Sequence, residues 1–182
     1  MVGEVRDTET AQMAFRAAMT GHQVFSTLHT NSAMRAIARL IDMGITPEVM
    51  AGNIIGIVAQ RLVRTLCTAC KVPYEPSFIE SQLMGIDIGI EPSTPPKLYW
   101  PVGCPQCEHT GYKGRRSIME LLRFDPELDD LIAQRASLKV MGEHLLRHGF
   151  VSLAADGLRC VREGETTIEE VGRVVDLTDG VT

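Results

Sequence analysis

Three things are scarce in this sequence, and each shortage excludes a class of protein. Aromatic residues make up only 5% of the 182 residues, and 18 Lys and Arg stand against 23 Asp and Glu, a net charge of −5. Proteins that bind nucleic acid need a basic face, often with aromatic side chains that stack on bases. The longest uncharged run, residues 49–60, is shorter than the ~20 apolar residues that span a bilayer. We therefore expect a cytoplasmic protein without a transmembrane segment, a leader peptide or a nucleic-acid partner.

The remaining composition, with 45% apolar and 23% charged residues, is that of an ordinary globular protein. The first 44 residues alternate strand and helix patterns. Residues 1–3 and 22–29 favour strands, and a helix follows each of them, the second over 33–43. Asp7 or Thr8 can cap the first helix, and Asn31 or Ser32 the second; Thr46-Pro47-Glu48 opens a third. This alternation predicts an α/β fold with a largely parallel sheet whose faces are covered.

The rest of the chain reads as mainly helical. Ser77 and Glu80 form a capping box that begins a short helix, and four Pro residues make 91–101 a loop. Residues 110–114 are predicted to form a turn, and residues 117–124 a strand. Four further helices are predicted to begin at Asp125, Ser137, Ser152 and Thr167, the last by a capping box with Glu170.

The five cysteines form two pairs and a single residue: Cys67 and Cys70, Cys104 and Cys107, and Cys160. Two Cys-x-x-Cys turns supply the four thiolates of a tetrahedral zinc site, although the gap between the pairs exceeds the usual ~15–20 residues. Redox dithiols or disulfides are the alternative, which a reducing compartment disfavours. A shell of four thiolates leaves no position for water, so the zinc is expected to be structural. Cys160 lies on an apolar helical face and is expected to be a small buried hydrophobe.

Polar chemistry gathers at the ends of the two predicted strands near the start of the chain. Glu4 follows the first strand, and hydroxyl, imidazole and amide side chains follow the second, over residues 26–31. Ligands of open parallel sheets bind at the carboxyl ends of the strands. A carboxylate there orders Mg²⁺-bound water or the water that attacks a phosphate. For His29 taken alone, the simpler interpretation is that the polar end of the strand caps the next helix.

Taken together, the motifs resemble the secretion ATPase superfamily, the hexameric motors of type II secretion and type IV pilus assembly (GspE/PulE- and PilB-like). The segments that carry the resemblance are GEVRD at 3–7, TGH at 20–22, STLHTN at 26–31, QRLVR at 60–64, CPQCEHTGYKGR at 104–115 and EEV at 169–171. The match covers nearly the whole chain. Retraction ATPases of pili lack the four-cysteine insertion, so the secretion and assembly branches fit better.

The resemblance implies a C-terminal part of a RecA-like P-loop ATPase sheet over 1–66, an inserted zinc-binding subdomain over 67–114 and a mainly helical subdomain over 115–182. It implies that Glu4, at the end of the Walker B strand, positions or activates the hydrolytic water. Arg6 and Asp7 are expected to hold the Walker B turn, with charge neutralisation as the alternative role of Arg6. It also implies that His22 and His29 couple the γ-phosphate to the subunit interface. The cofactors implied are structural Zn²⁺, with ATP and Mg²⁺ in the intact parent. The partners implied are a homo-hexamer and platform proteins of the inner membrane, to which the motor is peripheral.

The sequence departs from a complete family member in one respect. No Gly-x-x-x-x-Gly-Lys-Ser/Thr motif occurs in it, and this phosphate-binding loop lies upstream of Walker B in the family. The chain is therefore expected to be a C-terminal piece of a longer protein and to hydrolyse no ATP by itself.

Two other functions remain open at this stage. A pilus-assembly or DNA-uptake ATPase of the same family shares all the quoted motifs. A non-enzymatic zinc-binding interaction module belongs to another class, since the segment 104–112 also resembles the zinc repeats of J-domain chaperones. That family repeats its knuckle several times at short spacing, and it leaves residues 1–44 unexplained.

Overall fold

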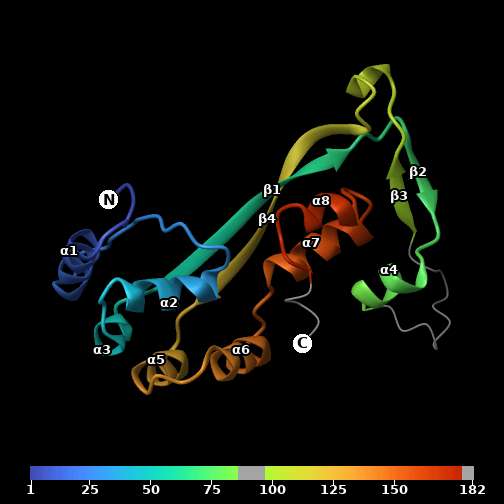
Figure 1. Cartoon of the computed structure of the whole chain (residues 1–182). Helices are drawn as coiled ribbons and strands as arrows, with labels where there is room; N and C mark the ends of the chain where they lie inside the picture. Colours follow the sequence, from blue (N-terminus) through green and yellow to red (C-terminus); the bar gives the residue numbers. More distant parts are fainter. Residues whose placement is uncertain (86–96, 178–182) are drawn as a thin grey trace. The chain divides into compact units, whose positions relative to one another are not determined.

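The computed structural model describes residues 1–85 and 97–177, which belong to two compact units. The first unit is formed by Met1–Ala59 and Glu120–Val151, and the second by Gln60–Met119 and Ser152–Thr182. The chain passes between them along two paired strands, β1 (Gly56–Leu66) and β4 (Tyr112–Arg123) (Figure 1). This division into two units does not test the finer division at residues 66 and 114, which stays a prediction.

The helices near the start of the chain begin where their capping residues predict. Helix α1 (Thr8–Met19) starts after Asp7, whose carboxylate accepts a hydrogen bond from the Thr10 N–H at 2.8 Å. Helix α2 (Ala33–Asp42) starts after Ser32, and α3 (Pro47–Met50) has Pro at its first position. The buried face of α2 carries Ala36, Ile37 and Leu40, which belong to the core of the first unit.

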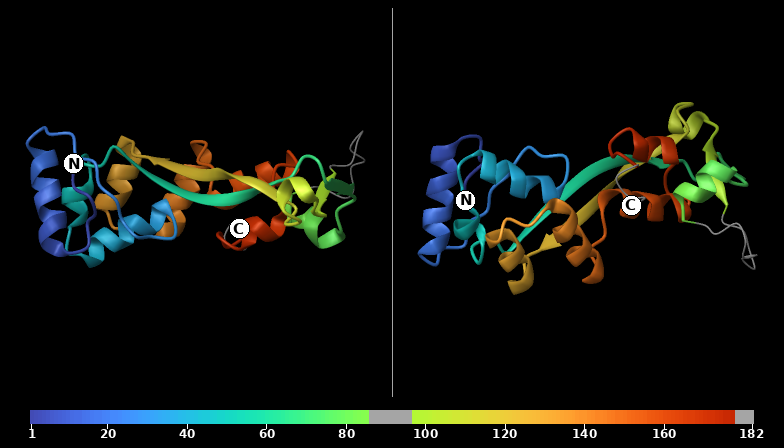
Figure 2. Two further views of the ribbon diagram at one scale, coloured as in Figure 1. Left: turned by 90° about the horizontal axis from the view of Figure 1, so that it is seen from above. Right: turned by 60° about the horizontal axis from the view of Figure 1, so that its bottom comes forward.

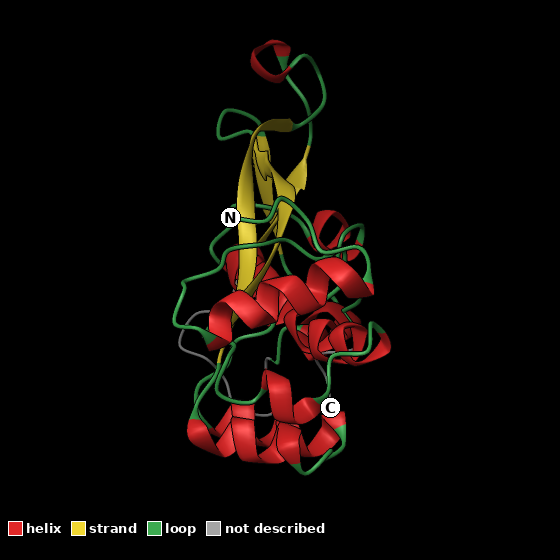
Figure 3. Ribbon diagram, turned by 90° about the vertical axis from the view of Figure 1, so that its left-hand side faces the viewer, coloured by secondary structure: helices red, strands yellow, loops and turns green. Residues whose placement is uncertain are grey.

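The largely parallel sheet predicted from this alternation is wrong for the described residues. Their sheets are two pairs, β1 with β4, and β2 (Lys71–Tyr74) with β3 (Leu98–Pro101), the latter antiparallel. Residues 1–3 and 22–29 form no strand, and the segment at the N-terminus is drawn as loop (Figure 3). They do run side by side, because Val2 and Val5 donate backbone hydrogen bonds to Phe25 and Thr27 at 2.9 and 3.0 Å. Two such bonds are too few to make a strand ladder.

Three further segments also differ from expectation. Residues 98–101 form β3 where a loop was expected, and β4 begins at Tyr112, inside the predicted turn. Strand β1 was not predicted. Its buried residues Ala59, Val63 and Leu66 have a spacing of four and three, which is more typical of a helix than of a strand. The predicted loop residues 91–96 lie outside the described residues.

The remaining helices confirm the predicted caps. Ser77 and Glu80 form the full capping box of α4 (Phe78–Leu83). Helices α5 (Pro126–Ala133) and α6 (Leu138–Arg147) belong to the first unit and lie next to each other (Figure 2). Helices α7 (Leu153–Arg162) and α8 (Ile168–Gly172) belong to the second. No helix among the described residues is long and apolar enough to cross a bilayer.

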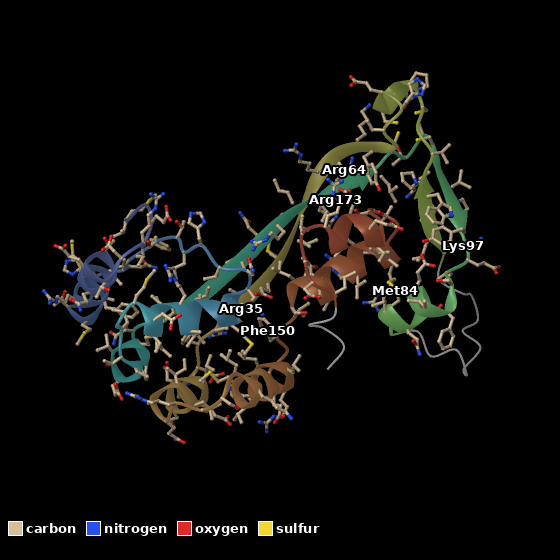
Figure 4. All side chains as sticks on the ribbon, in the orientation of Figure 1. Arg35, Arg64, Met84, Lys97, Phe150 and Arg173 are labelled. Carbon is tan, nitrogen blue, oxygen red and sulfur yellow. The ribbon has the colours of Figure 1, made fainter. Side chains whose placement is uncertain are left out.

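Glu170 departs from its predicted capping role and joins α8 to β1. Glu170 is 6% exposed, and its carboxylate accepts two hydrogen bonds from the guanidinium of Arg64, one of them at 2.7 Å, and one from Arg173 at 3.1 Å. Arg64 and Arg173 are labelled in Figure 4. The Arg64 guanidinium also lies 4.1 Å from the ring centroid of Tyr112 on β4. A buried carboxylate held by two guanidinium groups therefore fixes α8 against the strand pair.

Replacing Glu170 by Gln is expected to lower the free energy of unfolding by about 1–3 kcal/mol at neutral pH. Removing one partner of a fully buried ion pair costs about 3–5 kcal/mol. The expected loss is smaller here because the Arg64 side chain is half-buried. The hydrogen bonds from Arg64 lower the pKa of Glu170, so its contribution is present above the unfolded pKa of ~4.3 and is lost as the pH falls through the folded value.

Urea unfolding followed by circular dichroism measures the difference from the wild-type chain at several pH values. The control is Glu169→Gln, because Glu169 is the exposed neighbour on the same helix. An equal loss of stability in both variants, or a Glu170→Gln deficit that stays constant down to pH 3, would contradict this role.

Candidate functional site

The first unit brings three of the predicted nucleotide-site residues together. Glu4 Oε1 lies 2.9 Å from His29 Nε2, and Glu4 Oε2 lies 2.5 Å from Arg6 Nη2. The hydroxyl of Thr27 donates to the backbone oxygen of Gly3 at 2.8 Å, which holds the two extended segments in register. Glu4 and His29 are therefore neighbours, although 24 residues separate them in the sequence.

The electrostatics of this cluster keep Glu4 ionised. The hydrogen bond from Arg6 is the largest cause and lowers the pKa of the Glu4 carboxyl; burial opposes it, and the charges of Arg6 and His29 lower the pKa further. The same contact raises the pKa of Arg6. The Glu4 side chain is 18% exposed, whereas that of His29 is 86% exposed. An ionised, partly shielded carboxylate beside a cation has the chemistry needed to orient a water molecule or a hydrated divalent ion.

A cavity of about 290 Å³ adjoins the cluster. Its lining consists of Glu4, Val5, Arg6, His29, Arg39 and Met43. Arg39 and Met43 come from α2 and its C-cap, four residues apart on one helix face, and sequence reasoning missed both. Arg39 adds a second guanidinium to this cavity.

His22 has a different environment. It is exposed, and its Nδ1 lies 3.1 Å from the hydroxyl of Thr20, at the C-cap of α1. It does not line the cavity that contains Glu4. Its predicted role in sensing a phosphate stays a prediction.

In the second unit the four paired cysteines converge. Their sulfur atoms all lie within 4.8 Å of one another, and three of the separations are 3.9 Å (Cys67–Cys104), 3.8 Å (Cys70–Cys107) and 3.8 Å (Cys104–Cys107). A tetrahedral zinc ion with Zn–S bonds of about 2.3 Å holds its sulfurs about 3.8 Å apart, whereas a disulfide joins them at about 2.05 Å. The geometry therefore matches a metal shell, and all five cysteines are free thiols.

Backbone N–H groups prepare the second knuckle for a thiolate. Cys107 Sγ accepts hydrogen bonds from the backbone N–H of Cys104 at 3.2 Å and of Gly111 at 3.3 Å. Burial raises the pKa of the Cys107 thiol, but these donors outweigh it, and the pKa falls to about 6. The thiolate is the form that ligates a metal, so the donor set fits zinc.

Gly111 is needed where the knuckle meets β3. Its φ is +79°, and a Cβ at this position would lie 2.5 Å from Cβ of Pro101 and 2.8 Å from the Pro101 carbonyl carbon. The Gly111 carbonyl also accepts the hydrogen bond of the Cys67 N–H at 2.9 Å, which joins the two knuckles. A side chain at Gly111 would therefore clash with Pro101 at the end of β3.

Cys160 is separate from this cluster in role and setting. It lies on α7, is fully buried, and burial raises the pKa of its thiol. This confirms the expectation of a small buried hydrophobe.

Solved structures with the same fold are ATPases. The ATPase DotB of Legionella pneumophila superposes with a TM-score of 0.61 at 21% identity, and the pilus retraction motor PilT with bound ADP with a TM-score of 0.62 at 24% identity. Each comparison covers 96% of this chain, and 37% and 39% of those two chains. At this level of identity the likeness shows the fold, and it confirms the α/β class predicted as part of an ATPase sheet.

Sequence relatives establish the family. The chain is 49% identical over 174 residues to the type II secretion system protein E of Pseudomonas aeruginosa. It is 48% identical over 174 residues to the type II secretion system ATPase E of Vibrio cholerae. It is also 44% identical over 178 residues to the type IV pilus assembly ATPase TfpB of Acinetobacter baylyi. The model of the type II/IV secretion system protein family matches residues 1–173, and the chain belongs to this family. The alignments cover 96–98% of this chain, which confirms the predicted resemblance.

The chain spans about a third of the length of these relatives: 34% of the two secretion proteins and 30% of the pilus ATPase. The family match runs through both the Glu4 cluster and the four cysteines. A zinc-binding interaction module related to J-domain chaperones is therefore no longer needed to explain the knuckles.

Replacing Gly111 by Ala is expected to lower the free energy of unfolding by about 2–4 kcal/mol, because the methyl group adds a clash with Pro101 to the cost of a positive φ. Gly114→Ala is the matched control. Gly114 has a φ of +88° but nothing within 4 Å of its added Cβ, so only the conformational cost of about 1–2 kcal/mol remains. Thermal or urea unfolding measures both. Equal losses in the two variants would show that the contact with Pro101 does not matter.

Proposed function

We propose that this chain is the C-terminal part of a hexameric ATPase that powers protein secretion by the type II system through ATP hydrolysis. The observation that carries the proposal is the contact between Glu4 and His29 beside a cavity that also holds two guanidinium groups. The relatives support it, since those at 49% and 48% identity are type II secretion proteins E. Its proposed partners are the other subunits of the hexamer and platform proteins of the inner membrane.

In this proposal Glu4 positions and activates the water that attacks the γ-phosphate. Its lowered pKa keeps it a carboxylate at neutral pH, as a general base or a water-orienting group requires. Arg6 and Arg39 supply positive charge where phosphate charge develops. His29 donates to Glu4 or to the γ-phosphate oxygen, so its contact changes when that phosphate leaves. Mg²⁺, when bound with ATP, would neutralise the β- and γ-phosphates.

A pilus-assembly ATPase is the second candidate. The 44% identity to a type IV pilus assembly ATPase over 98% of the chain favours it almost as much. Both branches use the same chemistry at Glu4. In this proposal the two branches differ in the inner-membrane platform protein that the motor contacts. The choice between them therefore does not alter the proposed roles of the site residues.

We also propose that Cys67, Cys70, Cys104 and Cys107 bind one structural zinc ion. The sulfur separations of 3.8–3.9 Å and the N–H donors to Cys107 support this. A closed shell of four thiolates makes the metal a scaffold for the segments that carry the knuckles and gives it no catalytic position.

The 182-residue chain alone is expected to show no Mg²⁺-dependent ATP hydrolysis, because no phosphate-binding loop motif occurs in it.

In the parent ATPase, Glu4→Gln is expected to lower kcat by about 10²–10⁴-fold with little change in nucleotide affinity, because it removes only the base. The control in the parent is Glu9→Gln, on the exposed first turn of α1. Turnover by the isolated chain that Glu4→Gln abolishes, or a parent Glu4→Gln enzyme with normal kcat, would refute the assignment.

The purified chain is expected to retain one tightly bound zinc ion after passage over a weak chelator, measured by atomic emission. Cys104→Ser is expected to lose it, and with it zinc-binding free energy on the order of 10 kcal/mol that supports the local fold. Hydrogen exchange of residues 67–74 and 98–111 should then speed up. Cys160→Ala, which removes the fully buried thiol of α7, is the control. Retention of zinc by Cys104→Ser, or its loss in Cys160→Ala, speaks against the four-cysteine site.

A further inference from the structure

The first unit contains a second group of metal-ligating side chains, which neither proposed role uses. Asp125 caps α5, His144 lies on α6, and His148 is the C-cap of α6. One ligand atom from each of the three lies within 4.8 Å of the others. His144 and His148 are four residues apart on one helix face, the spacing at which two imidazoles reach one ion.

The surroundings of His144 leave one of its nitrogens without a partner. Its side chain is 0% exposed, its Nε2 lies 3.1 Å from both carboxylate oxygens of Asp125, and its Nδ1 has no hydrogen-bond partner. Nδ1 is 3.5 Å from a carboxylate oxygen of Glu127. A neutral imidazole has one N–H and one lone pair. One of the two carboxylates therefore faces a lone pair, unless a cation lies between Nε2 and Asp125.

A metal ion removes this conflict. With a cation held by Nε2 and Asp125, the proton resides on Nδ1 and points toward Glu127, whose side chain is 63% exposed and can approach. This arrangement, a ligating imidazole whose other nitrogen donates to a carboxylate, is the usual support of a metal-bound histidine.

His148 has the complementary arrangement. Its Nδ1 lies 2.9 Å from the backbone oxygen of His144. When Nδ1 donates to that oxygen, the lone pair of the imidazole resides on Nε2, as a metal ligand requires. Its ring centroid is 4.2 Å from that of His144, so the two imidazoles lie against each other.

We propose that Asp125, His144 and His148 form a second divalent-metal site, which takes zinc or a similar borderline ion with two imidazoles and one carboxylate. Such a set leaves at least one position for water, unlike the four-thiolate site. The ion would join the start of α5 to the end of α6. The inference is independent of the proposed ATPase function, because it rests only on residues of these two helices.

Isothermal titration tests the site in the chain whose four cysteines already hold one equivalent of zinc. Added zinc is expected to produce one further binding event per chain. His148→Gln removes a ligand from an exposed position, and Asp125→Asn removes the carboxylate while keeping a good helix cap. Each is expected to weaken the second event at least about tenfold. Arg147→Gln, an exposed neighbour on the same turn, is the matched control and should leave it unchanged.

Two results overturn the proposal. One is a second event that is the same in His148→Gln, Asp125→Asn and Arg147→Gln, which places the added zinc elsewhere. The other is no second event up to millimolar zinc.

Discussion

The pairing of β1 with β4 is the constraint on which the rest of the structure depends. Both strands contribute residues to both units. At one end, the Phe124 N–H donates to the Ile55 oxygen at 3.2 Å, and at the other the Cys67 N–H donates to the Gly111 oxygen at 2.9 Å. The pairing thereby brings together positions 44 apart in the sequence at one end (67 and 111) and 69 apart at the other (55 and 124). One Cys-x-x-Cys turn follows β1 and the other precedes β4, so without this pairing the two turns would not be held next to each other.

The two predicted sites are held in different ways. The four sulfurs are surrounded by a close backbone frame, in which Gly111 approaches Pro101 and N–H groups point at Cys107. The Glu4 cluster is held by two backbone hydrogen bonds, one threonine hydroxyl and ion pairs with exposed partners. The contrast agrees with the proposed roles, a structural metal at the four cysteines and a water-orienting carboxylate at Glu4.

Much of the local structure was predictable. Helix starts followed from Asp7, Ser32, Ser77, Asp125, Ser137, Ser152 and Thr167, because a side-chain acceptor before a helix meets the need of its first N–H groups wherever the helix lies. Strand β1 was not predictable, because its burial pattern resembles that of a helix. The parallel sheet was predicted wrongly, because a short extended segment becomes a strand only when neighbours complete its ladder.

Residue types and spacing by themselves determined the family, the grouping of four cysteines and the pairing of a carboxylate with a histidine segment. These are properties of short motifs, in which the chemistry is set by residues a few positions apart. Only the tertiary structure decided that Arg39 lines the same cavity as Glu4, that Glu170 pairs with Arg64 instead of capping its helix, and that Asp125 meets His144. Each of these arrangements joins residues of different segments of the chain. Such contacts depend on which faces of helices and strands are buried against each other, and no local pattern specifies that.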